Sequence, residues 1–288
     1  MTHDEEHHDG AVHEHDRGLS HDLPTLFSRR RMLTLAGAAG LATLAACSSG
    51  DTSASSGATP TAGASTTTPS PSASASAAAG TGAKIPAETA GPFPGDGSNG
   101  INVLTESGIV RSDLTASFGT GSAVARGVPL TMTLRVLDTA NGSAPLVGAA
   151  VYVWHCDREG RYSLYSDGVT DENYLRGVQA ADGTGTVTFT SVYPGAYQGR
   201  WPHVHFEVYP SLAKATTASD KLRTSQLALP EDASKLVYAT SGYGASAGNL
   251  EGTSLSTDNV FRDGYSLQLA SVTGTVEKGL TATLNVPV

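Results

Sequence analysis

Short stretches in which apolar and polar residues alternate recur along the chain, separated by turns that contain glycine. They lie at residues 130–137, 184–190 and 203–209. Successive side chains of a strand point to opposite faces, so each stretch can bury one face. Residues 149–154 form a continuous apolar run, which indicates a strand buried on both faces. We therefore predict an all-β fold, a β-sandwich with few short helices.

Weaker signals extend this prediction toward the C-terminus. Residues 236–239, 265–272 and 279–286 are further candidate strands, with another strand or turn at 273–278. The one predicted helix is a short piece at 230–235, where acidic residues follow Pro230.

The first 46 residues have the pattern of an export signal. The run Ser-Arg-Arg-Arg-Met-Leu at 28–33 resembles the twin-arginine motif, and an apolar stretch follows it. That stretch has about 15 residues, whereas a bilayer span needs roughly 20. The run Leu-Ala-Ala-Cys at 44–47 resembles a bacterial lipobox. We predict lipidation at Cys47, with an ordinary signal and a chance cysteine as the alternative.

Residues 47–83 are almost entirely Ser, Thr, Ala, Gly and Pro. Such a composition buries too little apolar surface to offset the entropy of ordering, so we predict a flexible tether. A folded domain is expected over 84–288, which is long enough for one sizeable core. With Cys47 lipidated, Cys156 has no partner for an intrachain disulfide and is expected to be a buried apolar residue.

The charge of the chain excludes some partners. Residues 1–46 contain 4 of the 18 basic and 7 of the 27 acidic residues, so 14 basic and 20 acidic residues remain, a net charge of −6. This balance argues against nucleic acid and leaves the lipid anchor as the only expected membrane contact. Six of the nine histidines lie within residues 2–22. A metal-binding tract is one reading, and a polar leader removed with the signal is the one we favour.

The most informative residues for function are two histidines and two tyrosines. His203 and His205 are two positions apart on a predicted strand, so their side chains share a face and form half of a metal site. Tyr162 and Tyr197 each follow a Gly-containing turn. A phenol becomes a ligand only for a cation acidic enough to remove its proton, and hard anionic oxygens favour Fe(III). Each residue alone is also typical of surface or packing positions.

The spacing Tyr162-x34-Tyr197-x5-His203-x-His205 resembles that of the intradiol ring-cleavage dioxygenases, which act on catechol, protocatechuate or hydroxyquinol. The resemblance extends over about residues 88–226. It implies non-haem Fe(III) as the cofactor, held by these four residues, with Tyr197 leaving the iron as the substrate binds. It also implies that the chain is an enzyme whose substrates are an aromatic diol and O2.

Two further roles follow from the same resemblance. Arg200 is implied to stabilise charge that develops on the bound ring, and Gln226, a weaker match, to form a hydrogen bond near the iron. Only five residues separate Tyr197 from His203, fewer than is typical of the family, and the family's helical dimerisation segment is absent. The sequence therefore leaves both the ring substituents of the substrate and the oligomeric state open.

The resulting hypothesis is an exported dioxygenase, lipid-anchored on the outer face of the cytoplasmic membrane. It would cleave catechol-type aromatics between the two hydroxyl-bearing carbons and release muconate-type diacids. A surface-anchored module that binds aromatic or carbohydrate material, with a vestigial iron site, is the alternative. Capture of iron or of a catecholate siderophore is a third reading.

Overall fold

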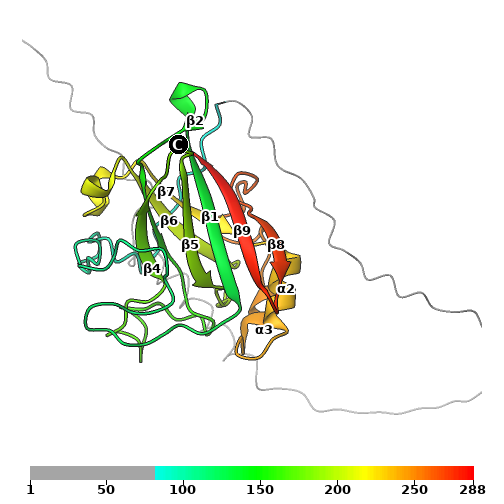
Figure 1. Cartoon of the computed structure of the whole chain (residues 1–288). Coiled ribbons are helices and arrows are strands. Elements are labelled where there is room, and N and C mark those ends of the chain that lie inside the picture. The colour runs from blue at the N-terminus through cyan, green and yellow to red at the C-terminus, as the bar shows by residue number, and fades with distance from the viewer. Residues whose placement is uncertain (1–81) are drawn as a thin grey trace, which may run out of the picture. The chain divides into compact units, whose positions relative to one another are not determined.

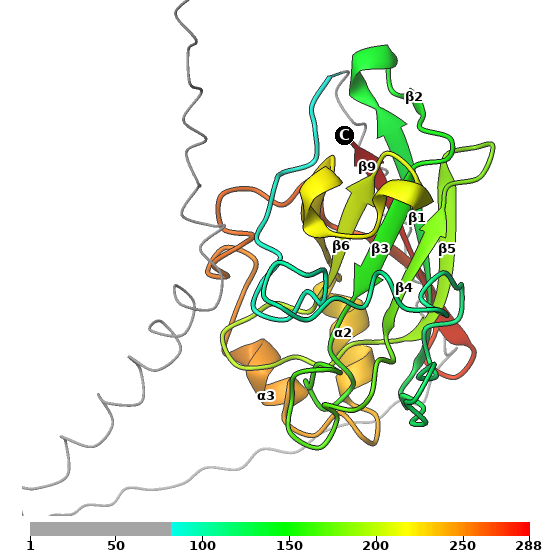
Figure 2. The ribbon, with the colours of Figure 1, turned by 90° about the vertical axis from the view of Figure 1, so that its left-hand side faces the viewer.

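Two β-sheets packed face to face form the fold described by a computed structural model of residues 82–288 (Figures 1 and 2). The predicted signal, Cys47 and nearly all of the predicted tether lie outside the described residues. The first sheet has the order β2-β1-β9-β8, and β5 also pairs with β1. The second has the order β4-β3-β6-β7.

The strands of the first sheet are β1 (Pro129–Asp138), β2 (Ala144–Pro145), β5 (Thr186–Val192), β8 (Ser271–Thr275) and β9 (Gly279–Pro287). Those of the second sheet are β3 (Ala150–Trp154), β4 (Arg176–Ala180), β6 (His203–Tyr209) and β7 (Arg223–Ala228). Pairing is antiparallel except between β1 and β9, which run parallel. The prediction of an all-β sandwich with few short helices is confirmed.

The main core lies between the sheets. Every second residue of β1 from Leu130 to Val136 is buried there, and β6 contributes Val204, Phe206 and Val208. These β6 residues alternate with polar ones that face the other side of the sheet. The apolar face of β6 therefore anchors the strand, and its polar face becomes available for a site.

The outer face of the second sheet is covered rather than exposed, so all seven residues of β6 are buried. A second apolar cluster joins Tyr152 and Trp154 of β3 to Val103, Leu104 and Ile109 from the segment before β1. Figure 2 shows this segment crossing in front of β3 and β6. The histidines of β6 consequently lie in a closed layer beneath it.

The structure corrects several local predictions. Residues 236–239 are not a strand, because residues 236–238 belong to helix α2 (Glu231–Tyr238), which buries Val237 and Tyr238 on one side, and Ala239 caps that helix. Residues 265–270 form turns and an isolated bridge, and β8 begins only at Ser271. Strands β4 and β7, and helix α3 (Ser246–Glu251), were not predicted. The buried polar residues of β7 break the alternation that marks a half-buried strand.

Three short 3-10 helices, η3 (Thr139–Asn141), η4 (Leu212–Lys214) and η5 (Ala218–Asp220), complete the regular structure of residues 82–288. Helices α2 and α3 both lie at one end of the sandwich (Figure 1). Within residues 82–288, no helix combines the length and apolar character needed to cross a bilayer.

Candidate metal centre

The four predicted ligands come from three segments that the fold brings together. His203 and His205 project from β6 toward the covered outer face of the second sheet. Tyr162 lies between β3 and β4, and Tyr197 lies in the loop that leads from β5 into β6. The chain places both phenols against the β6 histidines.

The polar ends of these side chains converge within hydrogen-bonding distance. The two phenol oxygens are 3.2 Å apart, and those of Tyr162 and Tyr197 lie 3.4 and 3.1 Å from Nε2 of His203. Nε2 of His205 lies 3.1 Å from the same nitrogen. Three groups therefore compete for one atom of His203.

A single lone pair cannot serve all of them. Nδ1 of His203 lies 2.5 Å from the carbonyl oxygen of Trp201, so it carries the proton and leaves Nε2 as an acceptor. Nδ1 of His205 is buried without a hydrogen-bond partner among residues 82–288. Buried polar groups normally have hydrogen-bond partners. Hydrogen bonds among these four side chains do not supply enough partners, so they alone do not explain the arrangement.

A cation fits the same four atoms. Ligands about 2.0–2.2 Å from one ion, at angles between a right angle and a tetrahedral one, lie roughly 2.8–3.6 Å from each other. The four distances given above, 3.1–3.4 Å, fall within this range. No group of three or more His, Cys, Asp or Glu residues in 82–288 could hold a metal, so the tyrosine oxygens are what completes this set.

Burial keeps the two imidazoles neutral. It lowers the pKa of His203 to about 3, with nearby Arg200 acting in the same direction. Burial and then the neighbouring His203 hold the pKa of His205 well below its usual value. Neutral imidazole is the form that binds metal ions. The site is therefore prepared for a cation at neutral pH.

Burial has the opposite consequence for the phenols. It raises the pKa of Tyr197 to about 12, although Arg200 opposes the shift, and it holds the pKa of Tyr162 well above 10. Both phenols remain protonated until a strongly acidic cation removes their protons. Two such phenols could become ligands only of a hard, highly charged ion, and binding of that ion would release protons.

The surroundings fix the ring of His205. Trp154 stacks on it with ring centroids 4.9 Å apart and planes inclined by 9°. On Gly91, which has a φ of +69°, a Cβ would lie 3.2 Å from Cε1 of His205. A side chain at position 91 would strain the backbone and press on the ring. Trp154 thus packs behind the site, and no single feature of the sequence pointed to Gly91.

Arg200 and Gln226 also reach this site. Gln226 lies directly opposite His205 in the β6–β7 register, and its Nε2 donates to the carbonyl oxygen of Thr89 at 3.1 Å. Nη2 of Arg200 donates to Oε1 of Gln226 at 2.6 Å. The structure therefore brings every predicted catalytic residue beside the four candidate ligands.

One charged residue at the site was missed by sequence reasoning. Asp258 is fully buried, and its Oδ2 accepts from Nε of Arg200 at 2.9 Å. It lies far along the chain, between α3 and β8, outside any motif. A lone aspartate in a turn carries no sequence signal of burial, so only the fold reveals it.

The site is open to solvent on one side. Tyr162, His203 and His205 are at most 3% exposed. Tyr197 and Arg200 are partly exposed, and Gln198 and Gly199 between them are exposed. A small molecule would therefore approach from the short connector that precedes β6.

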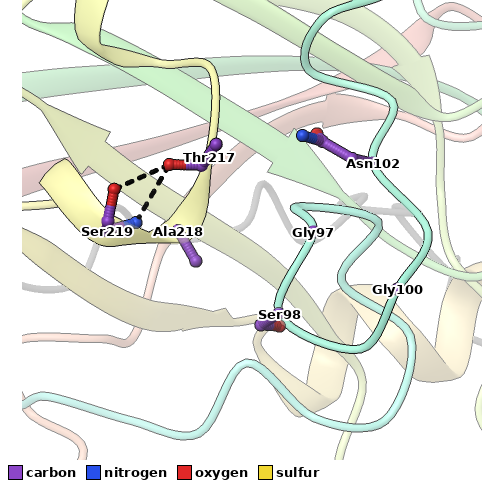
Figure 3. Close-up of a pocket in the computed structure, with 7 residues that line it drawn as sticks. All are labelled: Gly97, Ser98, Gly100, Asn102, Thr217, Ala218 and Ser219. Atoms are coloured by element: carbon purple, nitrogen blue, oxygen red, sulfur yellow. Dashed lines mark hydrogen bonds between the residues drawn. The ribbon is translucent and has the colours of Figure 1, made fainter.

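A separate hollow of about 450 Å³ lies away from these residues (Figure 3). It is formed by the loop that contains Gly97, Ser98, Gly100 and Asn102 and by Thr217, Ala218 and Ser219 near η5. None of the predicted site residues lines it.

The known proteins to which this chain is similar are dioxygenases. A family model described as "Dioxygenase" matches residues 106–218, the segment that contains Tyr162, Tyr197, Arg200, His203 and His205. A chlorocatechol 1,2-dioxygenase of Rhodococcus opacus is 30% identical over 94 residues, which are 28% of this chain and 36% of the relative. The match thus spans little more than a third of that curated relative.

Among solved structures, an intradiol ring-cleavage dioxygenase from Tetranychus urticae is similar with a TM-score of 0.51 and 25% sequence identity. The similarity covers 63% of this chain and 87% of that one. The β-sandwich of this chain therefore has the same fold as that intradiol dioxygenase.

Proposed function

We propose that residues 106–218, which match the family model described as "Dioxygenase", belong to an intradiol ring-cleavage dioxygenase domain, and that the chain is a non-haem Fe(III) intradiol dioxygenase. It acts on a catechol-type aromatic and O2. The reaction breaks the bond between the two hydroxyl-bearing carbons and places both oxygen atoms in a muconate-type diacid, so no external reductant is required.

The observation that carries this proposal is the convergence of both phenol oxygens and Nε2 of His205 on Nε2 of His203, at distances of 3.1–3.4 Å. Tyr162, Tyr197, His203 and His205 would hold the iron. When bound, Fe(III) supplies a centre that chelates both hydroxyls of the diol and makes the ring reactive toward O2. Two phenolates also balance much of its charge.

Tyr197 is suited to a proton-transfer role. It is the only one of the four candidate ligands that is partly exposed, and it lies on the side from which substrate enters. With its own proton lost to a bound Fe(III), its oxygen would be able to accept the proton of an arriving substrate hydroxyl. Tyr162, at 3% exposure, lies in the closed layer and remains in place.

Arg200 supplies a fixed positive charge at the open side. Its guanidinium is held by Asp258 and Gln226, so little reorganisation is needed when negative charge develops on the ring. Such preorganised donors stabilise a transition state more than a ground state.

Oxygen uptake by the iron-loaded full chain tests the proposal. An oxygen electrode with catechol, protocatechuate and hydroxyquinol should record one O2 consumed per diol for at least one substrate, together with a diacid product. Tight binding of a diol without uptake of O2 by iron-loaded protein would instead indicate a binding module or a capture protein.

Export and anchoring form part of the same proposal. Signal residues 1–46, lipidation at Cys47 and a tether to residue 83 would place the domain of residues 84–288 outside the cytoplasmic membrane. In a bacterial host with lipoprotein processing, the wild-type chain should partition into detergent. A Cys47→Ser chain should stay in the aqueous phase, and equal partitioning of the two would contradict the anchor.

A further inference from the structure

We propose that Asp258 is a positioning residue that orients two parts of the site at once, Arg200 and His203. Its effect on turnover rests on the proposed function, whereas its effect on geometry does not. The proposal comes from a set of hydrogen bonds that begins at one carboxylate and ends at a candidate iron ligand.

Asp258 is held rigidly before it contacts the site. Its side chain is fully buried, and Oδ1 accepts from the backbone N–H groups of Val260 at 2.8 Å and Phe261 at 3.2 Å. Phe261 is itself fully buried in the main core. The carboxylate is therefore fixed by its own turn and by the core beneath it.

The second carboxylate oxygen holds Arg200. Oδ2 accepts from Nε at 2.9 Å, and Nη2 of Arg200 donates on its other side to Gln226 at 2.6 Å. A guanidinium has five N–H groups in a rigid plane. Two contacts fix the orientation of that plane, and the remaining donors stay free for a substrate. The arginine side chain is 15% exposed, so it can meet one.

The same oxygen also fixes the peptide that leads to His203. Oδ2 accepts from the backbone N–H of Trp201 at 2.7 Å, and the Trp201 carbonyl lies 2.5 Å from Nδ1 of His203. That second contact determines which nitrogen of His203 carries the proton and leaves Nε2 directed at the other donors. Oδ2 of Asp258 thus holds both the guanidinium of Arg200 and the peptide that orients His203, a candidate metal ligand.

This coupling explains how a short connector can be precise. Only Gln198 to Pro202 separate Tyr197 from His203. Residues 198 and 199 are exposed, whereas Trp201 and Pro202 are buried. Asp258 contacts the connector where it becomes buried, from a segment more than fifty residues away. The contact with Asp258 therefore fixes the conformation of the connector where it enters the core.

The test compares Asp258→Asn with Glu207→Gln in the full chain. Asparagine keeps the size of the side chain and can still accept from Val260 and Phe261. Its amide N–H groups would then face the N–H groups of Arg200 and Trp201. Glu207 is the matched control, because it is another fully buried carboxylate bonded to a base, Lys221, at 3.2 Å.

We expect Asp258→Asn to reduce kcat by about 10–100-fold, the usual effect of removing a supporting partner, with bound iron retained. In an Arg200→Ala background the same substitution should reduce kcat by less, because the part of its effect that passes through Arg200 is already lost and only the part that passes through Trp201 to His203 remains. Glu207→Gln should leave kcat unchanged. An equal loss in both backgrounds, or an equal loss in the control, would show a general structural effect and overturn the proposal.

A second measurement needs neither turnover nor a variant of Asp258. In the iron-free wild-type chain, the Nε–H of Arg200, assigned by its loss in Arg200→Lys, should exchange slowly with solvent, as should the Trp201 amide. Rapid exchange of either group would refute the positioning role even if oxygen uptake is observed. Slow exchange without oxygen uptake would support the positioning role and count against the proposed function alone.

Discussion

The two ends of strand β6 present the same face of the same sheet but differ in how their polar groups are satisfied. At one end, Glu207 accepts from Tyr209 at 2.6 Å, Thr224 at 3.0 Å and Lys221 at 3.2 Å. Both of its oxygens have donors. At the other end, two phenols and His205 crowd around one nitrogen of His203.

The difference separates a structural network from a site. A buried carboxylate whose oxygens all have hydrogen-bond donors, including one of opposite charge, stabilises the fold. It has no oxygen left to bind a ligand. At the histidine end of β6 the polar groups outnumber the hydrogen bonds available to them, and the proposed cation would bind the groups that are left over. The predictions below test whether the two ends differ in this way.

The largest effect is expected from His203→Ala. Loss of this nitrogen removes the atom on which the other three groups converge. Iron affinity should fall by more than the about 10–100-fold that accompanies loss of a mere supporting partner. Metal analysis after dialysis checks this, with Glu207→Gln as the control that keeps its iron. Equal iron contents in the two variants would contradict the proposed difference between the two ends of β6.

Arg200→Ala should affect turnover without affecting the metal. The candidate ligands remain, so iron should stay near one per chain, while kcat falls by about 10²–10³-fold, as for loss of one preorganised donor to developing charge. Steady-state oxygen uptake and metal analysis on the same sample measure both quantities. An unchanged kcat would show that Arg200 does not stabilise the transition state.

Glu207→Gln should affect stability only. The amide cannot accept from all three of its neighbours, and buried groups left without partners cost about 1–3 kcal/mol. Chemical denaturation of the iron-free chain should show this loss of unfolding free energy, with oxygen uptake of the folded, loaded variant unchanged. Loss of iron here would mean that the two ends of β6 act as one unit.

A smaller effect concerns acid stability of the iron-free chain. Burial lowers the pKa of His155 to about 4 and that of His203 to about 3, and also lowers that of His205. Between pH about 6.5 and 4 the unfolded chain therefore binds protons that the folded chain does not, so stability decreases as pH falls.

Glu88 opposes this trend. Burial raises its pKa to about 7, so stability is lost as pH rises between about 4.5 and 7. Burial also raises the pKa of Glu207, which acts in the same direction as Glu88. Three histidines should outweigh these two carboxylates, and the unfolding free energy should fall by at most about 1.4 kcal/mol per pH unit for each net proton. Constant stability from pH 6.5 to 4.5 would show that the histidines are not neutral when buried.

The local sequence pattern predicted those strands whose burial follows from their own alternation of apolar and polar residues. Alternation identified β1, β5 and β9, because each buries one face. It failed for β7, whose polar residues are buried by the covering segment and by β6. Residues 236–239 have strand propensity, but the helix started by Glu231 and Asp232 overrides it.

The same division holds at the site. Tyr162, Tyr197, His203 and His205 are recognisable because each follows a motif along one stretch of chain, and the structure brings them together, although their role as ligands stays a prediction. Asp258 and Gly91 act through contacts that exist only after folding. Burial of a charge and close approach of a backbone depend on distant segments, so no local pattern reveals them.

The visible absorption spectrum of the Fe(III)-loaded full chain tests the central claim most directly. Two tyrosinates on one ferric ion should give a tyrosinate-to-iron charge-transfer band with one iron per chain. The band should weaken in Tyr162→Phe and in Tyr197→Phe. It should remain unchanged in Tyr165→Phe, a nearby tyrosine whose hydroxyl bonds to Asn99 and Gly95 instead. A wild-type chain that binds iron without this band, or a band indifferent to positions 162 and 197, would contradict the account.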